Sequence, residues 1–431
     1  MSLLLQKAPV DRMSGAARPA PPGCGFVNDS GLSPIAANDA QPTDPFLAFR
    51  IPANDHRRIL AWDRAWTEQR RAAGLEGVIA LALSGGGANG AFGAGVMVGW
   101  TKFGDRPIFD VVTGVSTGAL IAPFVFAGPE WDARLQAACH DPRLGRLACG
   151  RLRALIGSAL AVLFDKSLVS SAPLFRMVDE YADEALLRAV AAQHDRGRRL
   201  LVATTNLDTQ DCVIWDLGAI AKASLRPDDH GRSLRLFRTV LVASASVPGL
   251  FSPTLIAADD TPAGAAEAHV DGCVSTPLFM APGSMTSSRP ESSVRPTGFY
   301  LVVNGNLNPP HRRTKAGAVS IMMRALDTMG RANTRAKVAA FEVFAEGAGA
   351  GVACAAIPDD RPANPFNFSP GNMRTLFELG YAQAARGEAF RRRGPLDERL
   401  RGRRQGARQR AKRLGRWGVR AMPAALSGSC V

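Results

Sequence analysis

A continuous apolar run over Val78–Leu83 constrains the fold of this chain most strongly, because it has strand length and no polar face. We expect a series of such strands, and the further runs lie at Phe109–Thr113, Leu200–Thr205, Cys212–Asp216, Thr239–Ala243 and Gly298–Val303. Helix-length segments lie between them, after Ala88, after Thr117, across 173–193 and across 314–344. Strands buried on both faces that alternate with helices predict an α/β domain with a central, mostly parallel sheet flanked by helices.

The composition along the chain predicts four parts. Residues 1–75 comprise a flexible leader, rich in Pro, Gly, Ala and Ser up to about residue 45, and a helix over 57–73. Residues 76–348 form the main α/β domain, and residues 349–390 form a C-terminal helical extension that includes a helix over 373–386. Residues 391–431 form a basic tail.

The positive charge of the chain is concentrated in this tail. The formal net charge is +14, and residues 391–431 contain 13 basic and 2 acidic residues, so the tail accounts for +11. Peripheral contact with an anionic membrane surface is one interpretation, and a solvated tail without a partner is the other. A nucleic-acid partner is disfavoured, because Trp417 is the one aromatic residue among these charges and no nucleic-acid-binding motif accompanies them.

No apolar run is long enough to span a bilayer, which needs about 18 to 20 residues, and the longest candidate is Ala154–Phe164. We therefore expect no transmembrane helix and favour a cytoplasmic or peripheral membrane location. Gly23-Cys24 resembles a lipoprotein cleavage site, which becomes relevant if the natural start lies upstream. The seven cysteines are scattered, and their spacing predicts neither a disulfide framework nor a zinc site.

A triple-glycine turn, Ser84-Gly85-Gly86-Gly87-Ala88-Asn89-Gly90, directly follows the first strand and precedes a helix. Consecutive glycines allow a sharp turn that leaves bare backbone N–H groups at a helix N-terminus, where they bind negatively charged oxygen. The anion is either a phosphate or the oxyanion of an acyl-transfer intermediate.

The spacing Gly85-x-Gly87-x-x-Gly90 also matches the dinucleotide-binding fingerprint. That motif requires an acidic residue at the far end of the next strand. Asp105 and Asp110 precede or begin that strand, so the nucleotide interpretation is disfavoured.

The next strand instead ends in Gly114-Val115-Ser116-Thr117-Gly118, a GxSxG pattern that joins it to an apolar helix. Strand, tight turn and helix form the setting of a nucleophile elbow, in which the flanking glycines permit a strained turn that projects the serine hydroxyl. The alternative is an ordinary N-cap serine in a glycine-rich turn. The preceding triple-glycine turn favours Ser116 as a nucleophile.

Ser116 needs a base, and Asp271 is the best candidate. It ends a short apolar segment and is followed by Gly272, which suits a carboxylate presented at a turn. A carboxylate can act directly as a base where partial desolvation raises its pKa. None of the six histidines has a comparable context, although His269 and His311 follow Ser116 and remain alternatives.

These motifs together resemble the patatin-like phospholipase family, a family of lipid acyl hydrolases. The match comprises the glycine turn, the Gly114–Gly118 elbow, the Asp271-Gly272 pair and, more loosely, Ala243–Phe251. The resemblance implies a patatin-like three-layer fold, a Ser116–Asp271 dyad, and an oxyanion hole of the Gly86, Gly87 and Ala88 amides. Supporting roles in the elbow and turns fall to Gly85, Gly90, Gly114, Gly118 and Gly272.

Two positions depart from the family pattern. Asn89 stands where members often have Arg or Lys, and Cys273 stands where the aspartate motif usually has Gly or Ala. Both departures concern head-group preference more than catalysis.

The resemblance further implies that the main domain, residues 76–348, is a catalytic domain that hydrolyses a lipid or fatty-acyl ester and needs no cofactor or metal. Acyl transfer and thioester hydrolysis use the same dyad chemistry and stay open. A non-catalytic protein that binds membrane lipids is the alternative of another class.

Overall fold

The computed structural model describes residues 46–144, 172–248, 250–257, 266–280 and 296–393, apart from 310, 312 and 315. These residues belong to one compact unit that begins at Pro45. The predicted leader, the apolar segment Ala154–Phe164 and the part of the basic tail beyond residue 393 lie outside the described residues.

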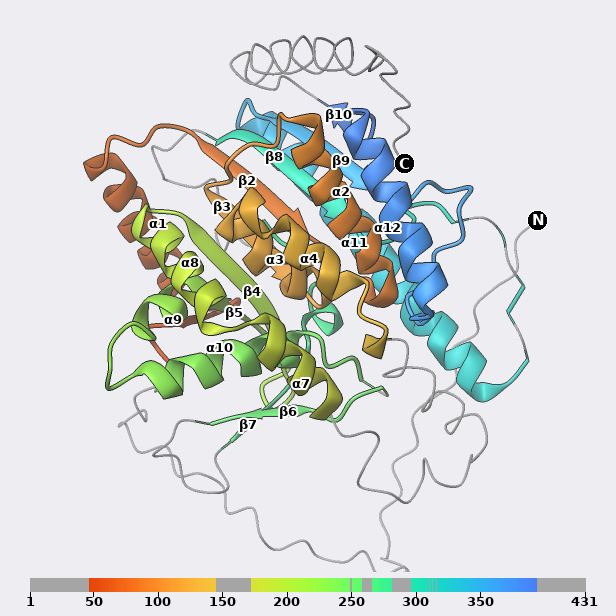
Figure 1. Cartoon of the computed structure of the whole chain (residues 1–431), viewed down its shortest axis with the longest axis horizontal. Coiled ribbons are helices and arrows are strands. Elements are labelled where there is room, and N and C mark those ends of the chain that lie inside the picture. Colours follow the sequence, from red (N-terminus) through yellow and green to blue (C-terminus); the bar gives the residue numbers. More distant parts are fainter. Residues whose placement is uncertain are drawn as a thin grey trace, which may run out of the picture. The chain divides into compact units, whose positions relative to one another are not determined.

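One sheet organises the described part of the chain, with the strand order β1-β5-β4-β3-β2-β8-β9-β10 (Figure 1). The five central strands, β4-β3-β2-β8-β9, pair in parallel, and the strands at both edges pair antiparallel. Two short strands lie off this path, where β7 pairs with β4 and with β6. The strands are β1 Arg50–Pro52, β2 Val78–Leu83, β3 Val111–Val115, β4 Arg199–Asn206, β5 Asp211–Asp216, β6 Thr254–Ile256, β7 Glu267–Asp271, β8 Pro296–Val303, β9 Gly351–Ala356 and β10 Arg391–Arg393.

Helices cover both faces of the sheet, so the predicted three-layer α/β fold is confirmed (Figure 1). On β2, Leu81 and Leu83 pack into the core beneath α2, α3 and α12, whereas Ala80 and Ala82 face the core that includes α1 and α11. The helices are α1 His56–Ala72, α2 Gly90–Phe103, α3 Thr117–Ala127, α4 Asp132–Cys139, α7 Ala172–Tyr181, α8 Glu184–Asp195, α9 Leu217–Ala223, α10 His230–Ser244, α11 Ala318–Gly347 and α12 Pro370–Ala385.

The predicted strand at Thr239–Ala243 is wrong, because these residues form the last part of α10. A short run of buried apolar residues has the same appearance in a strand and in a buried helix. Val240 and Val242 are fully buried there, so the run is apolar because the core encloses this end of the helix. The segment expected to be helical over 173–193 forms two helices, since Asp183 accepts a hydrogen bond from the Leu186 N–H and caps α8.

The segment predicted as a C-terminal helical extension contributes to the central sheet. Strand β9 pairs in parallel with β8, and β10, at the start of the predicted basic tail, pairs with β9. Helix α12 packs along α2. The boundaries proposed at 75/76, 348/349 and 390/391 stay predictions. In the described residues, no helix combines the length and the apolar character that crossing a membrane requires.

Glycines allow α2 and α12 to pack backbone against backbone. A Cβ atom at Gly95 would lie 2.0 Å from the Phe377 carbonyl oxygen, and one at Gly99 would lie 2.3 Å from that of Tyr381. On the opposite helix, a Cβ at Gly380 would lie 2.2 Å from the carbonyl oxygen of Phe92. Any side chain at these positions therefore forces the two helices apart.

We predict that Gly99→Ala lowers the free energy of unfolding by about 2 to 3 kcal/mol, because the added methyl group meets backbone that cannot rotate away. Chemical denaturation measures the effect. Gly371→Ala is the matched control, since it lies in α12 and a Cβ there meets nothing within 4 Å. Equal stability of the two variants would contradict the packing argument.

Candidate active site

Ser116 occupies the sharp turn between β3 and α3, as the GxSxG pattern predicts. Its φ of 55° and ψ of −124° lie in a region that residues other than glycine rarely adopt, so its backbone is strained. The Ser116 N–H donates to Ser244 Oγ over 3.0 Å, and the Ser244 hydroxyl donates to the Ala203 carbonyl over 2.7 Å. These bonds hold the strained turn against α10 and β4.

Asp271 lies at the end of β7, within hydrogen-bonding reach of this turn. Ser116 Oγ donates to Asp271 Oδ2 over 2.5 Å, and the Cys273 N–H donates to Asp271 Oδ1 over 2.8 Å. Both side chains are buried, with 3% of Ser116 and 2% of Asp271 exposed. The structure therefore brings together two groups that are 155 positions apart in the sequence.

Burial sets the protonation behaviour of this pair. Desolvation raises the pKa of Asp271 to about 6, although the hydrogen bonds from Ser116 and Cys273 lower it in part. Burial likewise raises the pKa of the Cys273 thiol well above its ordinary value, and the nearby Asp271 carboxylate adds to this shift. The thiol beside the dyad therefore stays protonated, whereas Asp271 can change its charge near neutral pH.

The glycine turn lies beside Ser116, and a Cβ atom at Gly85 would lie 3.1 Å from the Ser116 Cβ. Among the described residues, no acceptor bonds to the amides of Gly86 and Gly87. The Ala88 N–H, which the resemblance implies as an oxyanion donor, donates to the Pro365 carbonyl over 2.9 Å in this structure. Thr117, the first residue of α3, has an amide that is likewise unbonded within the described residues.

The five glycines predicted to support the turns all stand where a side chain would meet neighbouring atoms. Gly114 and Gly118 allow the two arms of the elbow to touch, since a Cβ at Gly114 would lie 2.6 Å from the Gly118 carbonyl oxygen. A Cβ at each of the other positions would meet, at 2.0 to 2.4 Å, an atom of another element. These contacts are Gly85 with Cys273 Sγ, Gly90 with Thr117 Oγ1, Gly118 with the Leu83 carbonyl and Gly272 with the Ala203 carbonyl.

Asn304, which follows β8, holds the glycine turn in place and was not predicted from the sequence. Its side-chain N–H donates to the Ser84 carbonyl over 2.6 Å, and its Oδ1 accepts from the Gly93 N–H over 3.1 Å. The Asn304 N–H donates to Ser84 Oγ over 2.8 Å. Ser244 was also missed, although it lies in the Ala243–Phe251 segment that resembles the family. The sequence feature that Ser244 and Asn304 share is a polar residue at the end of an apolar run.

A large, mainly apolar pocket opens onto Ser116. Its volume is about 790 Å³, within the range of small-molecule binding sites. Aliphatic and aromatic side chains from α3, α4, α7 and α10 line one part of it, including Leu120, Phe124, Leu135, Leu174 and Leu241.

Polar and charged side chains also line the pocket. Asn304, Asn306, Asp327 and Arg331 line it, and Asp327 accepts two hydrogen bonds from the Arg331 guanidinium. Asn89, where the family often has a cation, also lines the pocket. It is 3% exposed, and its Oδ1 has no hydrogen-bond partner in the described part of the structure.

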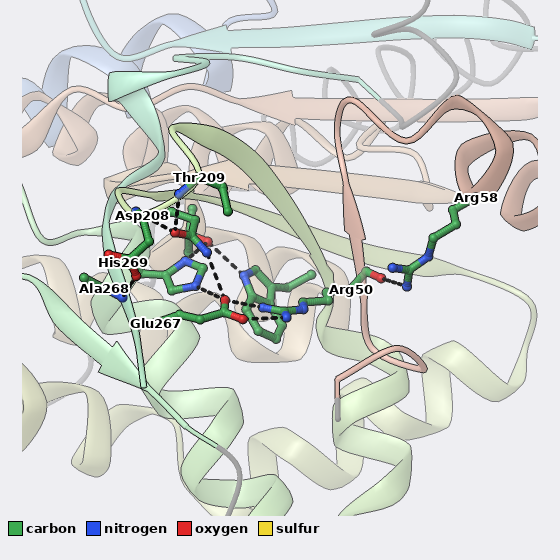
Figure 2. A network of polar contacts seen from close by, with 10 residues as sticks. Arg50, Arg58, Asp208, Thr209, Glu267, Ala268 and His269 are labelled. Carbon is green, nitrogen blue, oxygen red and sulfur yellow. Dashed lines mark hydrogen bonds and ion pairs between the residues drawn. The ribbon is translucent and has the colours of Figure 1, made fainter. Parts of the chain in front are cut away.

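The histidines considered as bases lie away from Ser116. His269 lies in β7 and is fully buried, and its ring nitrogens contact Thr204 Oγ1 at 2.9 Å and Glu267 Oε2 at 3.0 Å. Figure 2 shows this network continuing from Glu267 to Arg50, whose guanidinium donates over 2.5 and 2.7 Å. His311 is exposed and ahead of α11. His269 therefore supports the strand that carries Asp271 and makes no contact with Ser116.

The carboxylates that a dinucleotide site would use are engaged in the fold. Asp110 accepts from the Ile79 N–H over 2.8 Å and pairs with Arg70 over 2.9 Å. Asp105 accepts from Trp100 Nε1 over 2.6 Å. Within the described ranges, no group of three or more His, Cys, Asp or Glu residues is arranged to hold a metal ion.

Comparison with known proteins gives one family match, in the part of the chain that carries Ser116 and Asp271. No curated protein matches the chain at a significant level of similarity. Among solved structures, the crystal structure of VipD from Legionella pneumophila has 11% sequence identity and a TM-score of 0.32, over 79% of this chain and 75% of VipD. The model of the family described as "Patatin-like phospholipase" matches residues 81–282, which include the glycine turn, Ser116 and Asp271. Residues 81–282 therefore match the domain of the patatin-like phospholipases, a family of lipid hydrolases.

Proposed function

We propose that this protein is a serine-dependent lipid acyl hydrolase in which Ser116 is the nucleophile and Asp271 is the base. The observation that carries the proposal is the 2.5 Å hydrogen bond from Ser116 Oγ to a buried carboxylate oxygen of Asp271. A hydroxyl and a base within this distance, with unbonded amides beside them, are the arrangement that acyl transfer requires.

In the proposed mechanism, Asp271 accepts the hydroxyl proton while Ser116 Oγ attacks the ester carbonyl carbon. The Gly86 and Gly87 amides, with the Thr117 amide as a third donor, stabilise the negative charge that develops on the carbonyl oxygen. Asp271 then protonates the departing alcohol, which leaves an acyl group on Ser116. A water molecule, deprotonated by Asp271, attacks this acyl-enzyme, the bond between the acyl carbon and Ser116 Oγ breaks, and Asp271 returns the proton to Oγ as the carboxylic acid is released.

The pocket supports a fatty-acyl substrate. The apolar side chains from α3, α4, α7 and α10 offer an acyl chain a surface free of charge next to Ser116. The ester carbonyl would then lie at the glycine turn, and the alcohol group would lie toward Asn306 and α11. Because Asp327 already neutralises the Arg331 guanidinium, this part of the pocket favours an alcohol group that does not depend on Arg331 for charge pairing.

We predict that Ser116→Ala and Asp271→Asn each lower kcat/KM for a short-chain ester by at least about 10³-fold, because each removes one reacting group. Hydrolysis of a chromogenic ester measures the loss, and thermal unfolding checks that both variants fold. A fluorophosphonate probe should label the parent at Ser116 and fail to label Ser116→Ala. Near-parental turnover in either variant would contradict the assignment.

The pH dependence follows from the pKa of Asp271. The base acts when it is deprotonated, and its pKa is raised to about 6, so kcat/KM should be highest above this pH and fall as the pH drops through it. A carboxylate with an ordinary pKa would keep full activity down to about pH 5. A pH–rate profile whose acid limb has its midpoint near 4 would contradict the burial argument.

We predict that Gly86→Ala lowers kcat by about 10²- to 10³-fold, because its Cβ would lie 2.2 Å from the Asn304 carbonyl oxygen and push the amides out of place. Gly305→Ala is the control, since a Cβ there meets nothing within 4 Å. Steady-state kinetics of both variants tests the proposal. Comparable rates for the two would exclude the turn as the oxyanion site.

A further inference from the structure

The two halves of α11 have different surroundings. Its second half packs on the sheet through Val338, Phe341 and Ala345, which are buried. In the first half, none of the side chains that the structure describes from Ser320 to Gly330 is buried. Figure 1 shows this part of the helix, in cyan, extending past the sheet. About three turns of helix are therefore held in place mainly by continuity with the packed half.

The exposed half of α11 has its apolar side turned toward solvent. Ile321, Met322, Leu326 and Met329 are 57%, 54%, 48% and 67% exposed. At about 100° per residue, these four side chains lie within an arc of roughly 140°. They therefore form one apolar face, which we call the α11 face.

The charged side of the same helix is turned toward the protein. The Arg331 guanidinium donates to the Asn306 carbonyl over 3.0 Å and to Asp327 over 2.9 Å, and the Arg331 side chain is 14% exposed. Arg324 also pairs with Asp327, at 3.5 Å. This orientation is the reverse of that expected for a surface helix of a soluble domain, in which the apolar side faces the core. A contiguous exposed apolar face of this kind marks an interaction site.

The α11 face is continuous with the pocket. Leu326 and Met329 are both part of the α11 face and part of the pocket lining. An apolar group bound against this face therefore lies next to the pocket, whose α11 lining also contains the Asp327–Arg331 ion pair.

We propose that the α11 face docks the protein onto the surface of a lipid bilayer, so that an acyl chain passes from the bilayer into the pocket beside Ser116. The route of the acyl chain rests on the proposed function, whereas the docking itself does not. The helix would lie in the plane of the interface with its apolar side chains inserted among the lipids, as amphipathic helices of peripheral proteins do.

Charge favours a bilayer over a second copy of this chain. Residues 318–337 contain four basic residues and one acidic residue, and the whole chain carries a formal +14. Two copies that bring these helices together repel each other, whereas most biological membranes present anionic lipids that attract them. Arg324 and Arg331 pair with Asp327, so the attraction to anionic lipid and the repulsion between two copies come from Arg335, Lys337 and the net charge of the chain.

The test measures partition of the full-length Ser116→Ala protein onto phosphatidylcholine vesicles in high salt. Salt screens the contribution of the basic segment 391–431, and the serine substitution prevents hydrolysis during the measurement. In this background, Ile321→Gln/Met322→Gln should lower the partition coefficient at least about tenfold, since two inserted apolar side chains are lost. Val343→Gln is the matched control, because Val343 is apolar, 70% exposed and on the packed half of α11. It should change partition by less than about twofold.

A second readout separates docking from catalysis. With Ser116 intact, Ile321→Gln/Met322→Gln should hydrolyse a dissolved short-chain ester at the parental rate and lose hydrolysis of vesicle lipids. Equal partition of the double variant and its parent, or no partition of the parent, would overturn the docking proposal. A dimer that the double variant dissociates in analytical ultracentrifugation would assign the face to a second copy and overturn it as well. Failure of Ser116→Ala to abolish hydrolysis would overturn the proposed function and leave the partition result unaffected.

Discussion

The contact between Ser116 and Asp271 depends on one edge of strand β4. Along this edge β3 pairs in parallel up to Val115, which lies opposite Ala203, and β7 continues antiparallel from Asp271, which lies opposite Thr204. Because Ala203 and Thr204 are consecutive, the two strands end at the same point from opposite directions. The serine turn and the carboxylate are therefore brought together by backbone register, and the glycines at 114, 118 and 272 make room for the close approach. The contact between Ser116 and Asp271 therefore does not require the ordering of a long, flexible side chain.

The same arrangement makes the site costly for the folded state. Raising the pKa of Asp271 from 3.8 to about 6 makes its ionised form about 3 kcal/mol less favourable in the folded protein than in the unfolded chain. The sign follows from proton binding: between these two values the folded state holds a proton that the unfolded state has released, so stability falls as the pH rises through this window. The Ser116 backbone adds strain. Glu267 and His269, which lie in β7, form hydrogen bonds with each other and with Arg50. These bonds stabilise the strand that carries the buried carboxylate and so offset part of this cost.

Local patterns predicted the parts of the site that depend on local structure. The strand, turn and helix around Ser116 and the glycine turn are encoded by consecutive residues, and the Asp271-Gly272 pair follows a short apolar segment, so these features were identified correctly as elements of structure. Ser244, Asn304 and Pro365 act through contacts more than 100 positions away in the sequence, so the neighbouring residues do not indicate which groups they contact. The engagement of the Ala88 amide by Pro365 is of this kind, because it depends on a loop before α12 that crosses the turn. Thr239–Ala243 was assigned as a strand because apolar residues follow one another where a helix end is buried on all sides, and the 3.6-residue periodicity of the helix is then no longer visible.

Helix α11 lines part of the pocket, so the proposed docking surface and the pocket beside Ser116 are neighbours. Asp271 is 2% exposed although it lines the pocket, and this desolvation raises its pKa. In the proposed docking, lipid bound at Leu326 and Met329, which line the pocket, would supply an acyl chain and exclude water from the pocket. In the same proposal, the orientation of the helix, with Arg331 turned toward Asn306 and the apolar side chains turned outward, places lipid beside the pocket that Ser116 and Asp271 line. Lipid at this place would keep water away from Asp271 during the proposed reaction.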